Sequence, residues 1–255
     1  MTSRVLTEKH TYDKVEVDSS TGEMSVWDNS IFPSVVRSRQ YAFFRRALES
    51  APTGARLDVG CGGGWTTHFF SQDGTTTVGI DVSRQLLMKA IEVRNPREEF
   101  AVADGGRLPL RNETVSLLVS VSALHHLPVE IALLEWMRVL KPGGMLVLLE
   151  PNILNPVGTL GRTMFPTETH TESERPFRPD KLRRALIAVG LEIVSWETQI
   201  LLAFAVSRAV RLLRLPKRAS DALSRLVERI EQVAGNFTDG NNLGWVILCL
   251  ARKGG

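Results

Sequence analysis

Cysteine is scarce in this chain, with only Cys61 and Cys249 among 255 residues. Two thiols so far apart in sequence do not indicate the disulfide framework by which small secreted domains are stabilised. The fold must then rest on a buried apolar core, and a length of 255 residues is sufficient to form one. The low cysteine content favours a reducing compartment, and we therefore expect a cytoplasmic location.

Long apolar runs and a strong charge of one sign are also missing. No stretch approaches the roughly 18 apolar residues that a membrane-crossing helix requires, and the first thirty or so residues lack the apolar centre of a secretory signal. The net charge is only +3, whereas a nucleic-acid-binding domain usually carries a clustered basic face. The composition therefore favours a small-molecule substrate over a nucleic-acid partner, and it leaves the oligomeric state open.

From residue 55 onward, short apolar runs alternate with amphipathic stretches. This alternation is typical of βαβ units, so we expect an α/β fold with a doubly wound, mostly parallel sheet. The expected strands are 55–59, 76–80, 99–102, 115–122, 145–149, 191–198 and 244–251. The expected helices are 33–50, 65–71, 83–93, 129–140, 180–189, 201–215 and 220–234.

The same pattern predicts how the chain is organised around this sheet. We expect an N-terminal arm and cap helix over 1–54, a ligand-binding core over 55–151, and a substrate loop or lid over 152–178. The lid is expected because long irregular connections in compact domains are usually functional or disordered. The remaining strands fall in 179–255, interrupted by a helical insertion at 201–235.

A glycine-rich stretch joins the first strand to the following helix. It reads Leu57-Asp58-Val59-Gly60-Cys61-Gly62-Gly63-Gly64, and glycines at such a junction allow a tight turn and close approach of a ligand to helix N-terminal amides. The dinucleotide fingerprint requires a third glycine where Trp65 stands, so that interpretation fails. Asp58 instead suits the cationic amino-acid end of S-adenosylmethionine, although the stretch could also be only a turn.

Two further aspartates follow the next two strands. Asp81 ends the second strand, where a carboxylate can accept two hydrogen bonds from a ribose diol. Asp104 follows the third strand beside Gly105, where it can accept from an adenine amine while Val82 flanks the ring. A single such aspartate is better interpreted as a loop or helix-cap residue. Three of them at successive strand ends indicate a nucleoside site.

On these motifs the chain resembles the class I S-adenosylmethionine-dependent methyltransferases, particularly the branch that acts on small molecules and lipids. The resemblance implies a Rossmann-like, seven-stranded sheet with the last strand antiparallel, and S-adenosylmethionine as cofactor. It also implies that Gly60, Cys61 and Gly62 line the methionine portion, that Asp81 holds the ribose, that Asp104 contacts the adenine, and that Ser120 lies near the methionine end. The motifs are 57–62, 79–81, 103–105 with Leu108-Pro109, and 140–144.

The candidates for a catalytic base are His125 and His126, just beyond the fourth strand. Either could accept a proton near neutral pH, although residues there can also serve packing. His170 and Glu150 are weaker candidates. No metal site is expected, because adjacent histidines point in different directions and no carboxylate is spaced to complete a set of ligands.

A basic, apolar stretch bears on the substrate. Residues 201–218 carry Arg208, Arg211 and Arg214 but no acidic residue, so they could contact an anionic membrane or shelter a lipidic acceptor. A lid helix with a solvated arginine edge is the plainer alternative. We therefore expect methyl transfer to oxygen, nitrogen or carbon of a small, hydrophobic or lipidic metabolite. The alternatives are methylation of a protein or RNA, and a cofactor-binding scaffold without catalysis.

Overall fold

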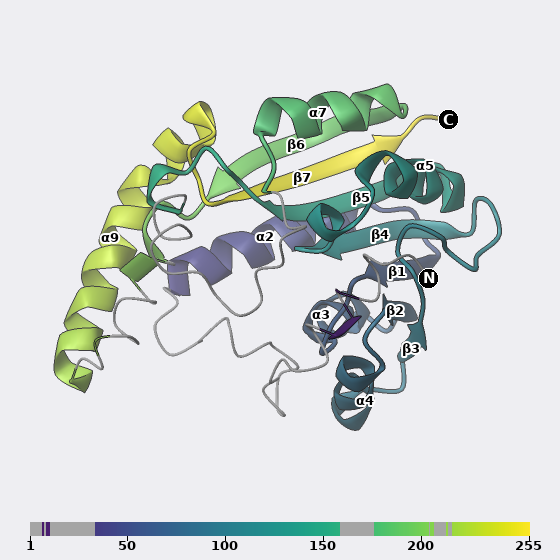
Figure 1. Ribbon diagram of the computed structural model, residues 1–255, viewed down its shortest axis with the longest axis horizontal. Coiled ribbons are helices and arrows are strands. Elements are labelled where there is room, and N and C mark those ends of the chain that lie inside the picture. The colour runs from purple at the N-terminus through teal and green to yellow at the C-terminus, as the bar shows by residue number, and fades with distance from the viewer. Residues whose placement is uncertain are drawn as a thin grey trace.

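The centre of the molecule is a single seven-stranded sheet in the order β3-β2-β1-β4-β5-β7-β6 (Figure 1). This computed structural model describes residues 34–158, 176–203 and 216–255, together with residues 7, 9, 10, 205, 206 and 213. The strands are β1 (Ala55–Val59), β2 (Thr77–Asp81), β3 (Glu98–Val102), β4 (Val115–Val121), β5 (Leu140–Pro151), β6 (Leu191–Gln199) and β7 (Val246–Lys253). The helices are α2 (Ser34–Ser50), α3 (Trp65–Ser71), α4 (Arg84–Val93), η1 (Leu124–His126), α5 (Val129–Val139), α7 (Pro179–Ala188) and α9 (Lys217–Asn241).

The strand order contains one point where the winding direction reverses. Strand β1 pairs in parallel with β2 on one side and with β4 on the other. In open α/β sheets, the crevice outside the carboxyl ends of two such strands is the usual ligand site. Strand β7 is antiparallel to both β5 and β6, and Figure 1 shows β6 and β7 pointing in opposite directions. The predicted seven-stranded sheet with an antiparallel last strand is confirmed.

Helices cover both faces of the sheet, and each face has its own apolar core. On one face, α5 and α7 pack through residues such as Trp136 and Leu182. On the other face, α2, α3 and α9 pack through residues such as Phe44, Phe70 and Val227. Strands covered on both sides have no solvent face, which is why β4 and β5 read as continuous apolar runs rather than alternating patterns.

Two elements differ from the sequence prediction. Strand β5 begins at Leu140, directly after α5, whereas we expected Lys141 to Gly144 to lie between helix and strand. Leu140 already pairs with Val115, and an irregularity before Leu117 absorbs the extra residues, so the proline and glycines sit within a bulged strand. Helix α9 is longer than the predicted 220–234. It continues through Gly235, whose missing side chain makes room for the guanidinium of Arg39 on α2.

Several predicted regions lie outside the described residues. They include most of the N-terminal arm, most of the lid with His170, and half of the basic stretch 201–218, including its three arginines. Among the helices that the structure does describe, none has the length and apolarity needed to span a bilayer.

A buried arginine fixes the start of β1 against the end of α3. Arg56 is 8% exposed, and its guanidinium donates to both carboxylate oxygens of Asp73, at 2.8 and 2.6 Å. It also donates to the carbonyl of Phe70. Bidentate pairs of this kind combine charge with a fixed geometry. Arg56 therefore holds the first turn of the βαβ unit in place.

We expect Arg56→Met to lower the free energy of unfolding by about 1–3 kcal/mol, because the Phe70 carbonyl and the Asp73 carboxylate lose their donor. Urea unfolding at neutral pH measures this change. Arg97→Met, at an exposed position just before β3, is the matched control. Equal losses in the two variants would contradict the role of Arg56.

Candidate functional site

The predicted glycine bend lies at the carboxyl end of β1 and is tied to the end of β2. The amides of Gly60 and Cys61 both donate to the carbonyl of Ile80, at 2.8 and 3.0 Å. Gly60 and Gly62 have φ angles of 74° and 52°, which glycine adopts without strain. A Cβ on Gly60 would also stand 2.3 Å from the Cβ of Ala123. The bend is therefore pressed against the residues that follow β4, at the point where the winding reverses.

Asp81 is part of the architecture of this bend as well as a candidate ligand residue. One carboxylate oxygen accepts from the amide of Gly62 at 2.9 Å, and the other accepts from the amide of Ser83 at 2.8 Å. A carboxylate has about four lone-pair positions, so each oxygen can still accept a ligand hydroxyl. The side chain is half-buried. The sequence predicted the location of Asp81 but gave no sign of its bond to the glycine bend.

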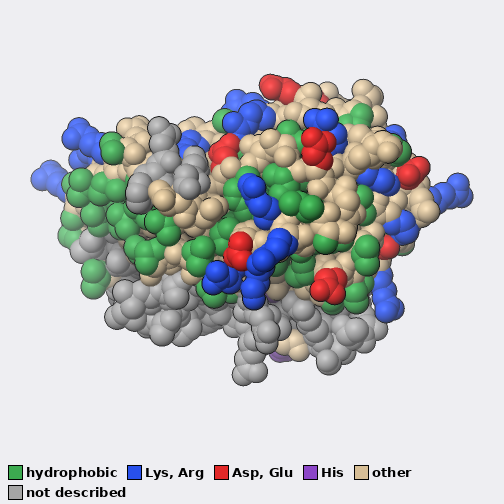
Figure 2. Space-filling model, turned by 90° about the horizontal axis from the view of Figure 1, so that it is seen from above, with side chains coloured by type: hydrophobic (Ala, Val, Ile, Leu, Met, Phe, Trp, Pro, Cys, Tyr) green, Lys and Arg blue, Asp and Glu red, His purple; other side chains and the backbone are tan. Residues whose placement is uncertain are grey.

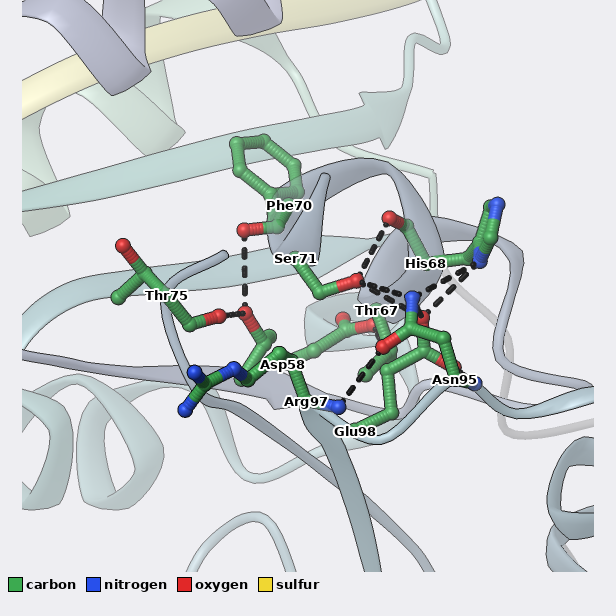
Figure 3. A network of polar contacts seen from close by, with 10 residues as sticks. Asp58, Thr67, His68, Phe70, Ser71, Thr75, Asn95, Arg97 and Glu98 are labelled. Carbon is green, nitrogen blue, oxygen red and sulfur yellow. Dashed lines mark hydrogen bonds and ion pairs between the residues drawn. The ribbon is translucent and has the colours of Figure 1, made fainter. Parts of the chain in front are cut away.

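Asp58 lies fully buried beneath α3 (Figure 3). Its Oδ2 accepts from the hydroxyls of Thr66 and Thr67 at 2.6 and 2.7 Å. Its Oδ1 has no hydrogen-bond partner among the described residues. Burial raises the pKa of Asp58 to about 6; the two threonine hydrogen bonds oppose this rise, and the charge of Asp81 adds to it. A buried carboxylate with one unsatisfied oxygen suits a cationic ligand group.

The end of β4 forms the other wall of the crevice. Ser120 is completely buried, and its hydroxyl has no partner in the part of the chain that the structure describes. Ser122 has a φ of 54°, and its amide donates to the carbonyl of Leu149 at 2.7 Å. Non-glycine residues in this region store strain and cluster at functional sites. No sequence signal marked Ser122.

His125 and His126 follow in η1, and they differ in their surroundings. Nδ1 of His125 lies 2.6 Å from the buried carboxylate of Glu150, and the His125 side chain is 3% exposed. His126 is half-buried, with its ring centroid 4.0 Å from that of His125. Both histidines therefore lie beside the end of β4, as expected, but His125 is engaged by Glu150. A base role for either remains a prediction.

Asp104 lies in the turn after β3, where one oxygen accepts from the amide of Gly106 at 2.9 Å. Asp104 and Val82 are half-buried, and Gly105 is buried. A Cβ on Gly105 would stand 2.6 Å from a methyl carbon of Val59, so only glycine lets this turn approach β1 so closely. The turn is anchored by Trp136, whose indole donates to the Gly105 carbonyl at 2.8 Å.

Two other chemistries find no support in this site. Cys61 is buried, and burial raises the pKa of its thiol well above the usual range, so it is protonated and a poor nucleophile. Among the described residues, no group of three or more histidine, cysteine or acidic side chains could hold a metal ion.

The predicted residues are thus brought together at one edge of the sheet. The edge offers a buried unsatisfied carboxylate oxygen at Asp58, a buried unsatisfied hydroxyl at Ser120, and half-buried carboxylates at Asp81 and Asp104. This donor and acceptor set fits a ligand with a cationic end, a diol and a flat amine-bearing ring. It therefore fits S-adenosylmethionine by the chemistry of its parts.

Comparison with known proteins gives matches for this core. Residues 57–148 match a family described as a methyltransferase domain. The chain is 36% identical over 110 residues to 2-methyl-6-phytyl-1,4-hydroquinone methyltransferase of Synechocystis sp., covering 41% of this chain and 35% of that protein. It is 32% identical over 136 residues to demethylmenaquinone methyltransferase of Streptomyces griseus, covering 51% of this chain and 58% of that protein. The chain thus spans less than two thirds of the length of each of these relatives.

A solved structure extends the likeness to the whole chain. Geranyl diphosphate C-methyltransferase from Streptomyces coelicolor A3(2) superposes with a TM-score of 0.66 at 14% identity, covering 99% of this chain and 98% of that one. At this identity the likeness shows the fold alone.

The buried charge of Asp58 should make stability depend on pH. Because its pKa is raised, the folded state binds more protons than the unfolded state between about pH 4 and 6. Stability from this group is therefore lost as the pH rises through that window, by about 3 kcal/mol for a shift of this size.

We expect the pH dependence of unfolding to change accordingly in Asp58→Asn, measured with urea at several pH values between about 4 and 8. Asp73→Asn is the control: hydrogen bonds from Arg56 lower the pKa of Asp73 to about 2, so its contribution to stability is lost only as the pH falls below about 4, and this substitution should leave the shape of the profile between about pH 4 and 8 unchanged. Identical pH profiles for wild type and Asp58→Asn would contradict the buried-charge interpretation.

Proposed function

We propose that this chain, a class I S-adenosylmethionine-dependent methyltransferase by its match over residues 57–148, methylates a small, hydrophobic metabolite. One observation carries the proposal. The glycine bend at the winding reversal is held by Asp81, between a buried carboxylate oxygen at Asp58 and a buried hydroxyl at Ser120. This is the edge at which an open α/β sheet binds its ligand.

Different residues of this edge contact different parts of the cofactor. Asp81 accepts from the ribose hydroxyls, while Asp104, with Val82 and Gly105, contacts the adenine. Gly60, Cys61 and Gly62 line the methionine portion, whose cationic end lies toward Asp58 and Ser120. When bound, S-adenosylmethionine supplies a methyl group already activated by a positively charged sulfur.

The chain's own task is then mainly to position an acceptor and to exclude water, which together can supply much of the rate. A hydroxyl or amine acceptor also has to lose a proton. We assign that proton to the histidine pair of η1: His126 is the half-buried member, and His125 is held beside it by Glu150. Near neutral pH a histidine is suited to this role.

The acceptor we favour is an aromatic ring bearing hydroxyl groups and an apolar tail. The two relatives are named as methyltransferases of 2-methyl-6-phytyl-1,4-hydroquinone and of demethylmenaquinone, and this supports a ring of that class. On the face drawn in Figure 2, acidic and basic side chains are interspersed, and hydrophobic side chains gather at the end where α9 lies. Mixed charge of this kind does not favour RNA as the substrate.

The first test is the binding of S-adenosylhomocysteine, measured by calorimetry. We expect Asp81→Asn to weaken the affinity by about 1–3 kcal/mol, roughly tenfold to hundredfold in Kd, because it removes charge-assisted hydrogen bonds. Asp73→Asn, in the turn between α3 and β2, is the control and should leave Kd unchanged. Unchanged affinity in Asp81→Asn would remove the ribose assignment. Cofactor binding without methyl transfer to any hydroquinone or other metabolite would favour a scaffold.

A lipid contact is a separate prediction for the insertion around residues 201–218. In the part that the structure describes, Leu213 is 68% exposed, and the neighbouring α9 exposes Leu226 and Val233 at 54% and 83%. On the same helix, Arg218, Arg225 and Arg229 are also exposed. At helical spacing Leu226, Val233 and the three arginines share one face of α9, which suits an anionic membrane surface. We also propose that the protein is located in the cytoplasm.

We expect salt-sensitive co-sedimentation with vesicles that contain phosphatidylglycerol, and none with phosphatidylcholine alone. The double substitution Arg225→Glu with Arg229→Glu should weaken this binding at least about tenfold, since each basic residue near such a surface contributes on the order of 1 kcal/mol. Arg84→Glu on α4 is the control. Absence of binding by the wild type would leave only the lid interpretation.

A further inference from the structure

Glu150 is a buried carboxylate near the end of β5 whose contacts extend beyond His125. It is 0% exposed. Its Oε1 accepts from the amides of Ala123 and Leu124 at 3.2 and 2.8 Å, and its Oε2 accepts from the amide of His125 at 3.4 Å. Oε2 also lies 2.6 Å from Nδ1 of His125. One side chain thus binds three successive amides and an imidazole of the segment after β4.

These bonds determine the shape of that segment. Residues 123–125 follow Ser122, whose φ of 54° turns the chain sharply out of β4. Buried backbone amides need acceptors, and here one carboxylate supplies them. Ala123 is the residue whose Cβ would collide with a side chain on Gly60. Glu150 therefore binds the amide of Ala123, and Ala123 in turn packs against the glycine bend at Gly60.

The same bonds fix where His125 carries a proton. An ionised carboxylate only accepts hydrogen bonds, so the short contact with Nδ1 requires a proton on that nitrogen. In the neutral imidazole the lone pair is then on Nε2. A carboxylate that orients an imidazole in this way selects one of its two tautomers.

We infer that Glu150 is a positioning residue for the cofactor site: it shapes the wall formed by residues 122–126 and holds His125 as its Nδ1–H tautomer. The inference rests on the proposed function, because it assumes that the crevice beside Gly60 receives S-adenosylmethionine. Glu150 acts through Ala123 and His125 rather than on the reacting atoms.

The molecule contains a second glutamate–histidine pair, formed by Glu98 at the start of β3 and His68 on α3 (Figure 3). Glu98, at the start of β3, is 3% exposed, and one of its oxygens lies 3.0 Å from Nδ1 of His68. It also accepts from the hydroxyl of Ser71 at 2.7 Å and from the amide of Asn95 at 3.1 Å. This pair ties α3 to β3 at the amino edge, away from the glycine bend. Its carboxylate is as buried as that of Glu150, although the His68 side chain is 51% exposed, so Glu98 serves as the control for a buried carboxylate at a different place.

The experiment compares Glu150→Gln with Glu98→Gln in the full chain. Both should lose stability in urea, because each replaces a buried carboxylate that accepts hydrogen bonds from neighbouring polar groups by a weaker acceptor. Glu150→Gln should also weaken S-adenosylhomocysteine binding by about tenfold, whereas Glu98→Gln should leave it within about twofold. Nitrogen-15 spectra of the histidines should show His125 as the Nδ1–H tautomer in the wild type and as a mixture in Glu150→Gln.

Each possible result either supports or contradicts the positioning role of Glu150. If Glu150→Gln binds S-adenosylhomocysteine as tightly as the wild type, or if His125 keeps its tautomer, the positioning role is overturned. Equal loss of affinity in both variants would also overturn it, since the effect would then be general destabilisation. If Glu150→Gln does not fold, Glu150→Asp keeps the charge but withdraws it, and it should show an intermediate loss of affinity; wild-type affinity there would contradict the inference. A wild type that fails to bind S-adenosylhomocysteine counts against the proposed function, while the His125 spectrum still tests the local role of Glu150.

Discussion

The carboxyl edge of this sheet depends on one kind of interaction, the hydrogen bond from a backbone amide to a buried or half-buried carboxylate. Asp81 accepts from the amides of Gly62 and Ser83, and Glu150 accepts from the amides that follow β4. Glu231 on α9 repeats the arrangement after β6, where it accepts from Leu201, Leu202 and Ala203 at 2.7 to 3.0 Å. Loops without regular partners of their own thereby acquire fixed conformations. A ligand site built from loops becomes rigid in this way.

Much of the fold was accessible from the sequence because its signals are local or periodic. Apolar runs alternating with amphipathic stretches predicted all seven strands, and the glycines after Val59 marked the bend. The three aspartates were found because strand ends in a parallel sheet meet at one edge. The boundaries that failed, at Leu140 and at the carboxyl end of α9, lie where pairing with Val115 or packing on Arg39 overrides the preference of proline and glycine for turns.

The rest could not be read from sequence, because it depends on which distant residues meet. Glu150 and His125 are 25 residues apart, and the local sequence around each of them does not predict their contact. The same holds for the strained φ of Ser122 and for the bond from Asp81 to Gly62, 19 residues away. Sequence reasoning identified the residues that could touch a ligand. It could not identify those that hold the ligand-binding residues in place.

The contact between Gly60 and Ala123 has a consequence for how this chain can vary. The space between the two α-carbons admits a single methyl group, and the backbone at Gly60 is in a conformation that side chains rarely adopt. The methyl group in this space therefore belongs to position 123. Two sites far apart in the chain thus form one steric unit, and position 60 cannot gain a side chain for as long as Ala123 and the bend keep their places.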